Sequence, residues 1–245
     1  MTQLSYPKAP ITEAVIEIKF ASPLDLDDIE KVSGKYLSYY PKRQNVQTLN
    51  VTVNLPGKQP DALTTNTDRK IGHRLSSVDM TEMLLMWESA FIISQLAPYP
   101  GWEFFYGRFV RDWAVWKRVM GFREISRIGV RYVNRIDIPI EGPIVEYEKF
   151  LNVYPKLPFE VVAAYAIQAV MPIEEIGCKV TLNSAAIPSP ILGHASYLFD
   201  QDIAIENDPP QSDDALFDLL GKIRIHKNKV FEACITDRAR ELFTR

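Results

Sequence analysis

The segment from Ile125 to Ile140 reads ISRIGVRYVNRIDIPI, and two kinds of side chain alternate along it. The apolar set at every second position is Ile128, Val130, Tyr132, Ile136 and Ile138, and the intervening set includes Arg127, Arg131, Arg135 and Asp137. Successive side chains of a strand point to opposite faces, so this pattern predicts one long β-strand. One face packs a core and the other carries a row of guanidinium groups. Asn134 interrupts the apolar set and needs either a buried hydrogen-bond partner or nearby water.

The sequence on either side of this strand predicts two similar halves. In the first half a strand at 13–20 precedes a helix at 29–39, strands at 46–55, 70–79 and 82–93, and a helix ending near Met120. Tyr36–Lys42 aligns with Phe150–Lys156 at an offset of 156 − 42 = 114 residues. Short identities of this kind also arise by chance, but strand phase and element order agree at the same offset. We therefore predict tandem β-α-β-β-β-α units at 1–121 and 122–245, which form one compact pseudo-symmetric domain.

These patterns together predict an α+β protein. An antiparallel sheet, or two abutting sheets, would have the long helices packed on one face. In the first long helix, Phe105, Phe109, Trp113 and Trp116 recur at helical spacing, which is typical of a core-facing stripe. The layout resembles helix-grip and TATA-binding-protein-like folds. A resemblance of architecture alone implies no particular function.

Composition narrows the possible functions. The 245 residues are 47% hydrophobic, and 28 basic against 31 acidic residues give a net charge of -3, which does not favour broad nucleic-acid or anionic-membrane binding. Two cysteines and an N-terminus without a signal-like apolar stretch predict a cytoplasmic protein. The chain has no glycine-rich phosphate loop, and its three histidines are far apart in sequence. We therefore predict no cofactor and no metal, although Asp200 and Asp202 have the i, i+2 spacing that some metal sites use.

The arginine row is the first candidate binding feature. At the 114-residue offset Arg127 and Arg131 correspond to Glu13 and Glu17, so cross-strand ion pairs are the leading interpretation. The alternative is that Arg127, Arg131 and Arg135 bind an anion, because arginine suits bidentate phosphate contacts. Asn134 joins this candidate set as the polar residue on the apolar face.

The aromatic helix is the second candidate feature. Most of its rings are expected in the core, and Trp102 is the outlying aromatic residue left for a partner. The candidate ligand- or partner-binding residues are therefore Arg127, Arg131, Asn134, Arg135 and Trp102. No catalytic residue is identified, because neither a nucleophile elbow nor a histidine and cysteine arrangement is present.

Three segments carry a resemblance to known proteins: PKAPITEAVIEIKF at 7–20, RIGVRYVNRIDIP at 127–139 and KVFEACIT at 229–236. Together they resemble a sporadically distributed family of uncharacterised bacterial proteins, over essentially the whole chain. The resemblance implies no catalytic residues, and the patchy distribution implies a role in antiphage defence. The leading hypothesis is a non-enzymatic sensor or adaptor that binds a protein partner or ligand. The alternatives are an enzyme with a site at the junction of the repeats and a nucleic-acid-binding module.

Overall fold

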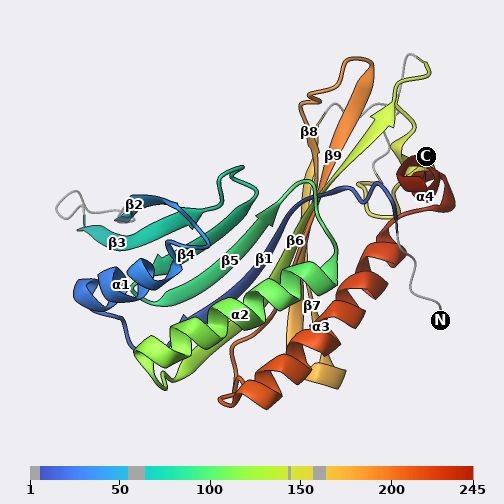
Figure 1. Ribbon diagram of the computed structural model, residues 1–245. Helices are drawn as coiled ribbons and strands as arrows, with labels where there is room; N and C mark the ends of the chain where they lie inside the picture. Colours follow the sequence, from blue (N-terminus) through green and yellow to red (C-terminus); the bar gives the residue numbers. More distant parts are fainter. Residues whose placement is uncertain (1–5, 55–63, 143–144, 157–163, 245) are drawn as a thin grey trace.

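The computed structural model describes residues 6–54, 64–142, 145–156 and 164–244. These residues form a single antiparallel sheet of nine strands in the order β2-β3-β4-β5-β1-β6-β9-β8-β7. The long helices α2 and α3 lie together on one side of the sheet (Figure 1). An α+β fold with a large antiparallel sheet is therefore confirmed, as one continuous sheet. The strands are β1 Ile11–Phe20, β2 Lys42–Asn54, β3 Thr64–Ser76, β4 Glu82–Trp87, β5 Ala90–Leu96, β6 Ile125–Pro139, β7 Ala166–Ile173, β8 Cys178–Ile187 and β9 His194–Ile205.

The helices are α1 Leu26–Ser33, α2 Trp102–Met120, α3 Asp213–Cys234 and α4 Asp237–Thr244, with 3-10 turns at Gly34–Tyr36, Tyr147–Lys149 and Glu174–Ile176. Acidic residues in the first turns of α1 and α3 favour helix starts there. In α3, the Ser212 side chain also accepts a hydrogen bond from the Ala215 N–H. No helix among the described residues is long and apolar enough to cross a membrane.

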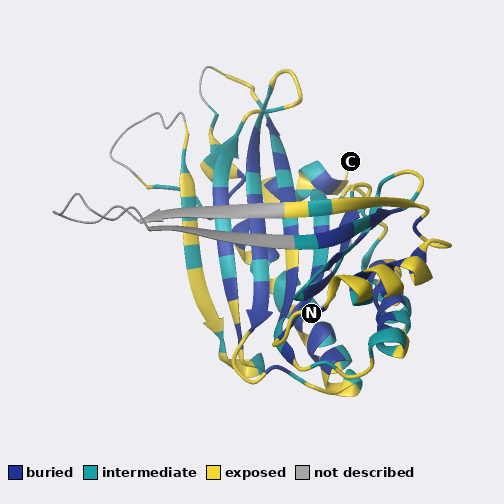
Figure 2. Ribbon diagram, turned by 90° about the vertical axis from the view of Figure 1, so that its left-hand side faces the viewer, coloured by how far each residue is buried: buried dark blue, intermediate teal, exposed yellow. Residues whose placement is uncertain are grey.

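Strand β6 lies next to the central strand β1 of the sheet, between β1 and β9. Its predicted alternation is confirmed, because Ile128, Val130 and Tyr132 are fully buried under the helices. The alternating buried and half-buried bands of the central strands are visible in Figure 2. Burial of each large apolar side chain stabilises the fold by about 1.5–3 kcal/mol, so the apolar rows of β1 and β6 anchor the sheet on the helices.

The aromatic stripe of α2 packs against this apolar face. Trp113 and Trp116 are 4% and 1% exposed, so the prediction that they are buried is confirmed. Their rings stack with centroids 5.0 Å apart, and Phe20 of β1 stacks on Trp116 at 4.5 Å. This contact fixes the helix against the first strand of the chain.

Some predicted elements differ from the observed ones. The single strand expected at 82–93 is wrong: β4 ends at Trp87 and β5 begins at Ala90, with Glu88 and Ser89 in a turn. The two apolar strands are joined by a turn of only two residues, without a long polar loop between them. The sequence pattern therefore predicted a single strand. The strand expected at 46–55 corresponds to β2, and Leu55 lies outside the described residues.

The two predicted halves do not contain the same set of elements. Within the described residues the first half has five strands and the second half has four, and a 3-10 turn at Tyr147–Lys149 precedes β7 where the first half has α1 before β2. The expected boundary at 121–122 falls between α2 and β6, and β1 and β6 pair across it. The internal duplication and the likeness to TATA-binding-protein-like folds stay predictions.

Candidate functional site

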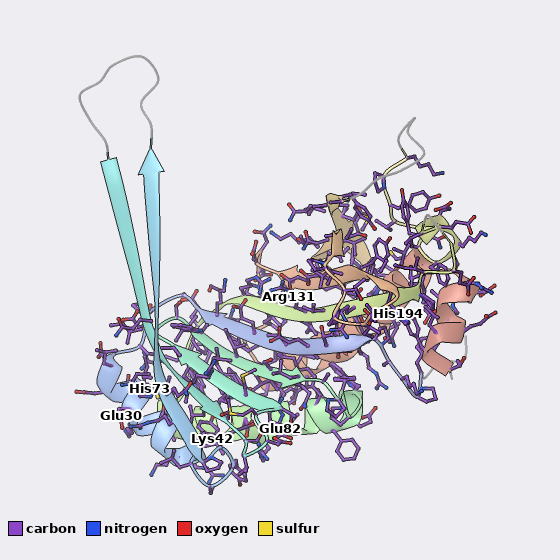
Figure 3. The ribbon with its side chains drawn as sticks, turned by 90° about the horizontal axis from the view of Figure 1, so that it is seen from above. Glu30, Lys42, His73, Glu82, Arg131 and His194 are labelled. Carbon is purple, nitrogen blue, oxygen red and sulfur yellow. The ribbon has the colours of Figure 1, made fainter. Side chains whose placement is uncertain are left out.

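The face of the sheet opposite α2 and α3, here called the open face, carries the predicted arginine row. Figure 3 looks onto this face, with Arg131 labelled on β6. The strand register places three charged rows side by side, because residues directly opposite on paired strands share a face. These rows are Glu13, Glu17 and Lys19 of β1, Arg127, Arg131, Arg135 and Asp137 of β6, and Asp200 and Asp202 of β9.

Arg127 joins three strands at the open face. Its Nη1 contacts Glu17, its Nη2 lies 2.5 Å from Asp202 Oδ2, and its Nε lies 3.3 Å from Glu206 Oε1. The side chain is only 13% exposed because it lies flat over Gly129, where a Cβ would meet the guanidinium. A glycine inside a strand usually marks such a close approach. Arg127 therefore holds β1, β6 and β9 together rather than projecting toward solvent.

Arg131 pairs with a different carboxylate from the one predicted. Its Nε and Nη2 donate to the two oxygens of Asp200 at 2.7 and 2.8 Å, a bidentate geometry that raises the pKa of Arg131. Glu13 instead accepts a hydrogen bond from Ser94 Oγ at 2.6 Å. Of the ion pairs predicted between these two arginines and the carboxylates of Glu13 and Glu17, the structure contains only Arg127–Glu17. The physical reason is that Arg131 reaches β9, where Asp200 is already held by Asn183.

The other charges that β6 and β9 present on the open face are also paired. The Nε of Arg135 lies 3.1 Å from both oxygens of Asp137, on the same strand. Burial raises the pKa of Asp202 and the Arg127 charge opposes that rise. The hydrogen bond from Lys179 lowers the pKa of Glu206. Each arginine of the predicted row therefore has a carboxylate partner, and Arg131, whose side chain is 51% exposed, is the most accessible of the three.

Trp102 and Asn134 lie away from the arginine row. Trp102 begins α2 on the helix side, where its ring stacks on Tyr106 with centroids 5.4 Å apart and lies beside Arg224. Asn134 is 2% exposed and its Nδ2 donates to the Phe199 carbonyl at 3.1 Å. In β6 its side chain points to the same face as the buried residues Tyr132 and Ile136. Its hydrogen bond to the Phe199 carbonyl therefore lies in the core. The structure therefore brings the three arginines together, but not Trp102 or Asn134.

The sequence analysis missed an apolar area beside the charged rows. Leu85 of β4 lies opposite Ile92 of β5, and Ile92 lies opposite Glu17 of β1. These side chains alternate with fully buried Leu84 and Ile93, so they belong to the open face, and they are half-buried. We call this area the open-face patch. Its members are Val15, Met83, Leu85, Trp87, Ile92 and Leu96.

Trp87 fixes the outer border of the open-face patch. Its ring lies over Gly72 of β3, where a Cβ would come within 2.9 Å of the ring. The glycine permits this close approach, so the indole lies flat against the sheet. The patch could have been predicted if 82–93 had been divided into two strands at the turn. The position of the turn determines on which face of the sheet each side chain of the two strands lies.

Groups suited to metal or thiol chemistry lie elsewhere or are sequestered. Within the described ranges no three His, Cys, Asp or Glu side chains are grouped to hold a metal ion. Burial raises the pKa of both the Cys178 and the Cys234 thiols to about 11. His73 lies beneath the sheet next to Ser33 Oγ, at 2.7 Å, and burial lowers its pKa. These side chains therefore contribute no reactive group to the open face.

One surface hollow, of about 830 Å³, lies at the end of β6 and is lined by residues that include Glu141, Phe150 and Arg238. Another hollow, of about 610 Å³, lies beside Phe122 and Glu206. Neither contains the open-face patch. Comparison of the chain with models of known protein families gave no match, and neither did comparison with curated proteins.

Proposed function

We propose that the protein is a non-enzymatic adaptor or sensor that binds a protein partner on its open face. The observation that carries this proposal is the open-face patch, a set of half-buried apolar side chains bordered by ion-paired charges. Protein interfaces characteristically have an apolar centre with aromatic residues and a polar rim. Trp87 would be the aromatic anchor at the outer border of the patch, and Arg131, the accessible arginine, would contribute to the rim on the other side.

The charge arrangement favours a protein partner over a nucleic acid. Arginines that hold phosphates must be free to donate, yet Arg127, Arg131 and Arg135 all donate to carboxylates of the same face. The neighbouring carboxylates also cancel the positive field that attracts a polyanion. For the enzyme alternative, the thiols with raised pKa values offer no activated nucleophile.

The resemblance to a sporadically distributed bacterial family supports a role in antiphage defence, in the cytoplasm. In that role, the open face would recognise another protein of the same defence system or a phage product. The test is the efficiency of plating of a phage panel on cells with the intact gene and with a variant altered on the open face. Equal plating in both strains would contradict the defence role without bearing on partner binding.

We also infer that the two halves arose by duplication. In each half the first strand pairs with the last strand, β1 with β5 and β6 with β9, and a long helix follows. Ile16 and Val130, equivalent under the 114-residue offset, lie directly opposite each other and are fully buried. Superposition of β1, β5, β4 and α2 on β6, β9, β8 and α3 tests this inference.

Site-specific photo-crosslinking tests the binding proposal. A photo-reactive amino acid at Trp87 is expected to capture a defined partner in the native host. The same amino acid at Phe104, which is 73% exposed on α2, is the matched control and is expected to capture none. Leu85→Arg should abolish capture from position 87 while the far-UV circular dichroism stays unchanged. Equal capture from positions 87 and 104 would contradict the assignment of the open face.

A further inference from the structure

Strand β7 forms one border of the sheet, and within the described ranges no strand covers its outer side. Among the described residues it pairs only with β8. The backbone C=O groups on its outer side, and the N–H groups except at Pro172, are therefore available to another strand. In Figure 2 the strand forms a largely exposed border of the sheet.

The sequence of β7, AIQAVMPI, contains no charged residue. Natural edge strands are usually guarded by lysine, inward-pointing charges, bulges or proline, and here Pro172 near one end is the only guard of these kinds in the sequence. Val170 on the open face is 59% exposed and Met171 on the helix side is 39% exposed. Apolar side chains are thus available on both sides of an unpaired backbone edge.

The opposite border of the sheet differs in these respects. Strand β2 begins with Lys42 and Arg43, and Arg43 pairs with Glu30 of α1 at 2.6 Å. It belongs to the β2–β3 hairpin, which extends away from the body of the protein (Figure 3). Charge and position therefore protect β2, and the contrast identifies β7 as the strand open to pairing.

We propose that β7 pairs antiparallel with β7 of a second copy of this chain. A twofold axis perpendicular to the sheet at Val170 would place Val170 opposite its own symmetry mate and Ile167 opposite Ile173 of the partner subunit. Side chains opposite each other would then share a face, as antiparallel pairing requires. A second copy fits this edge because the positions that would pair, 167–173, are all uncharged, so no like charges meet across the axis. On the neighbouring strand β8, Lys179 already forms an ion pair with Glu206, with 2.6 Å between Nζ and Oε2.

This dimer would give the protein one continuous sheet with both open faces on the same side. Two patches presented together would bind a dimeric or repetitive partner with avidity, without any new contact within each site. The dimer does not depend on the proposed function of the open face. It can be tested on the purified protein alone.

Sedimentation velocity of the wild-type protein over a concentration series, with Val170→Lys beside it, tests the pairing. We expect a reversible dimer for the wild type and a monomer for Val170→Lys, because two lysines would meet at the axis. The substitution lies at an exposed position, and an unchanged thermal midpoint verifies that the variant is folded. A wild type that is monomeric at every concentration, or a Val170→Lys variant as dimeric as the wild type, would overturn the proposal.

Disulfide trapping provides a second readout. Val170→Cys should form a covalent dimer on mild oxidation, since the new thiols would face each other across the axis. Asn45→Cys, exposed on β2 at the other border, is the matched control. The native Cys178 and Cys234 are buried and should not react. Crosslinking at position 170 no faster than at position 45 would rule out pairing through β7.

Discussion

Removal of the Arg127 guanidinium should destabilise the centre of the sheet more than removal of any other arginine in the row. Arg127→Met keeps much of the unbranched stem and deletes the charge that faces Glu17, Asp202 and Glu206. The loss leaves carboxylates from β1 and β9 next to one another without a cation between them. We expect the variant to fold with a clearly lowered free energy of unfolding.

The magnitude follows from how far these groups are buried. Exposed ion pairs contribute about 0–1 kcal/mol, whereas removal of one partner of a fully buried pair costs about 3–5 kcal/mol. The side chains of Arg127, Glu17 and Asp202 are 13%, 21% and 28% exposed, which is between these limits. We therefore expect a loss of about 2 kcal/mol at pH 7. In a protein of this size that corresponds to a fall of about 4–8 °C in Tm.

The loss should shrink as the pH falls. Burial already raises the pKa of Asp202 and Arg127 opposes the rise, so in Arg127→Met this pKa is higher still. A carboxyl whose folded-state pKa exceeds its unfolded-state value destabilises the fold above that pKa, and protonation relieves the penalty. Urea unfolding of wild type and variant at pH 7 and pH 5 measures the difference. A difference that grows toward pH 5 would refute the electrostatic explanation.

Arg135→Met is the matched control. Arg135 has the same chemistry on the same strand, but its side chain is 34% exposed and its partner is Asp137 of its own strand. Its removal breaks no contact between strands and should cost less than about 1 kcal/mol. An equal loss in both variants would show that the position of Arg127 between three strands has no special energetic role.

Three further predictions concern other parts of the fold. Trp116→Ala should cost about 3–5 kcal/mol in urea unfolding, because the ring is 1% exposed and stacked on Phe20; wild-type-like unfolding would contradict this packing. Asn134→Ala should cost about 0.5–1.5 kcal/mol by removing a buried side-chain hydrogen bond to the Phe199 carbonyl, yet leave photo-crosslinking from Trp87 unchanged. Burial lowers the pKa of Lys227 to about 8, so the charged amine disfavours the folded state below that pH. Lys227→Met should therefore raise Tm at pH 7, and the gain should decline toward pH 10. A gain in Tm that is constant with pH would refute this explanation.

Local periodicity was sufficient to predict the parts of the fold that depend on neighbours in sequence. The period of two along 125–140 identified the buried row with Val130 and the charged row with Arg127, because strand geometry alone determines which side chains share a face. The helical spacing of Trp113 and Trp116 predicted their burial for the same reason. These patterns also predicted the α+β class and a sheet with helices packed on one of its faces.

Only the tertiary structure decided which groups meet across the sheet. Arg131 pairs with Asp200, 69 residues away, because β9 rather than β1 offers a carboxylate within its reach. The open-face patch depends on the turn at Glu88 and Ser89, which sets the phase of two strands at once. Strand order and register arise from packing the whole sheet against its helices, and no local period records them. Asn134 shows the same limit, since its partner, the Phe199 carbonyl, becomes its neighbour only when β9 pairs with β6.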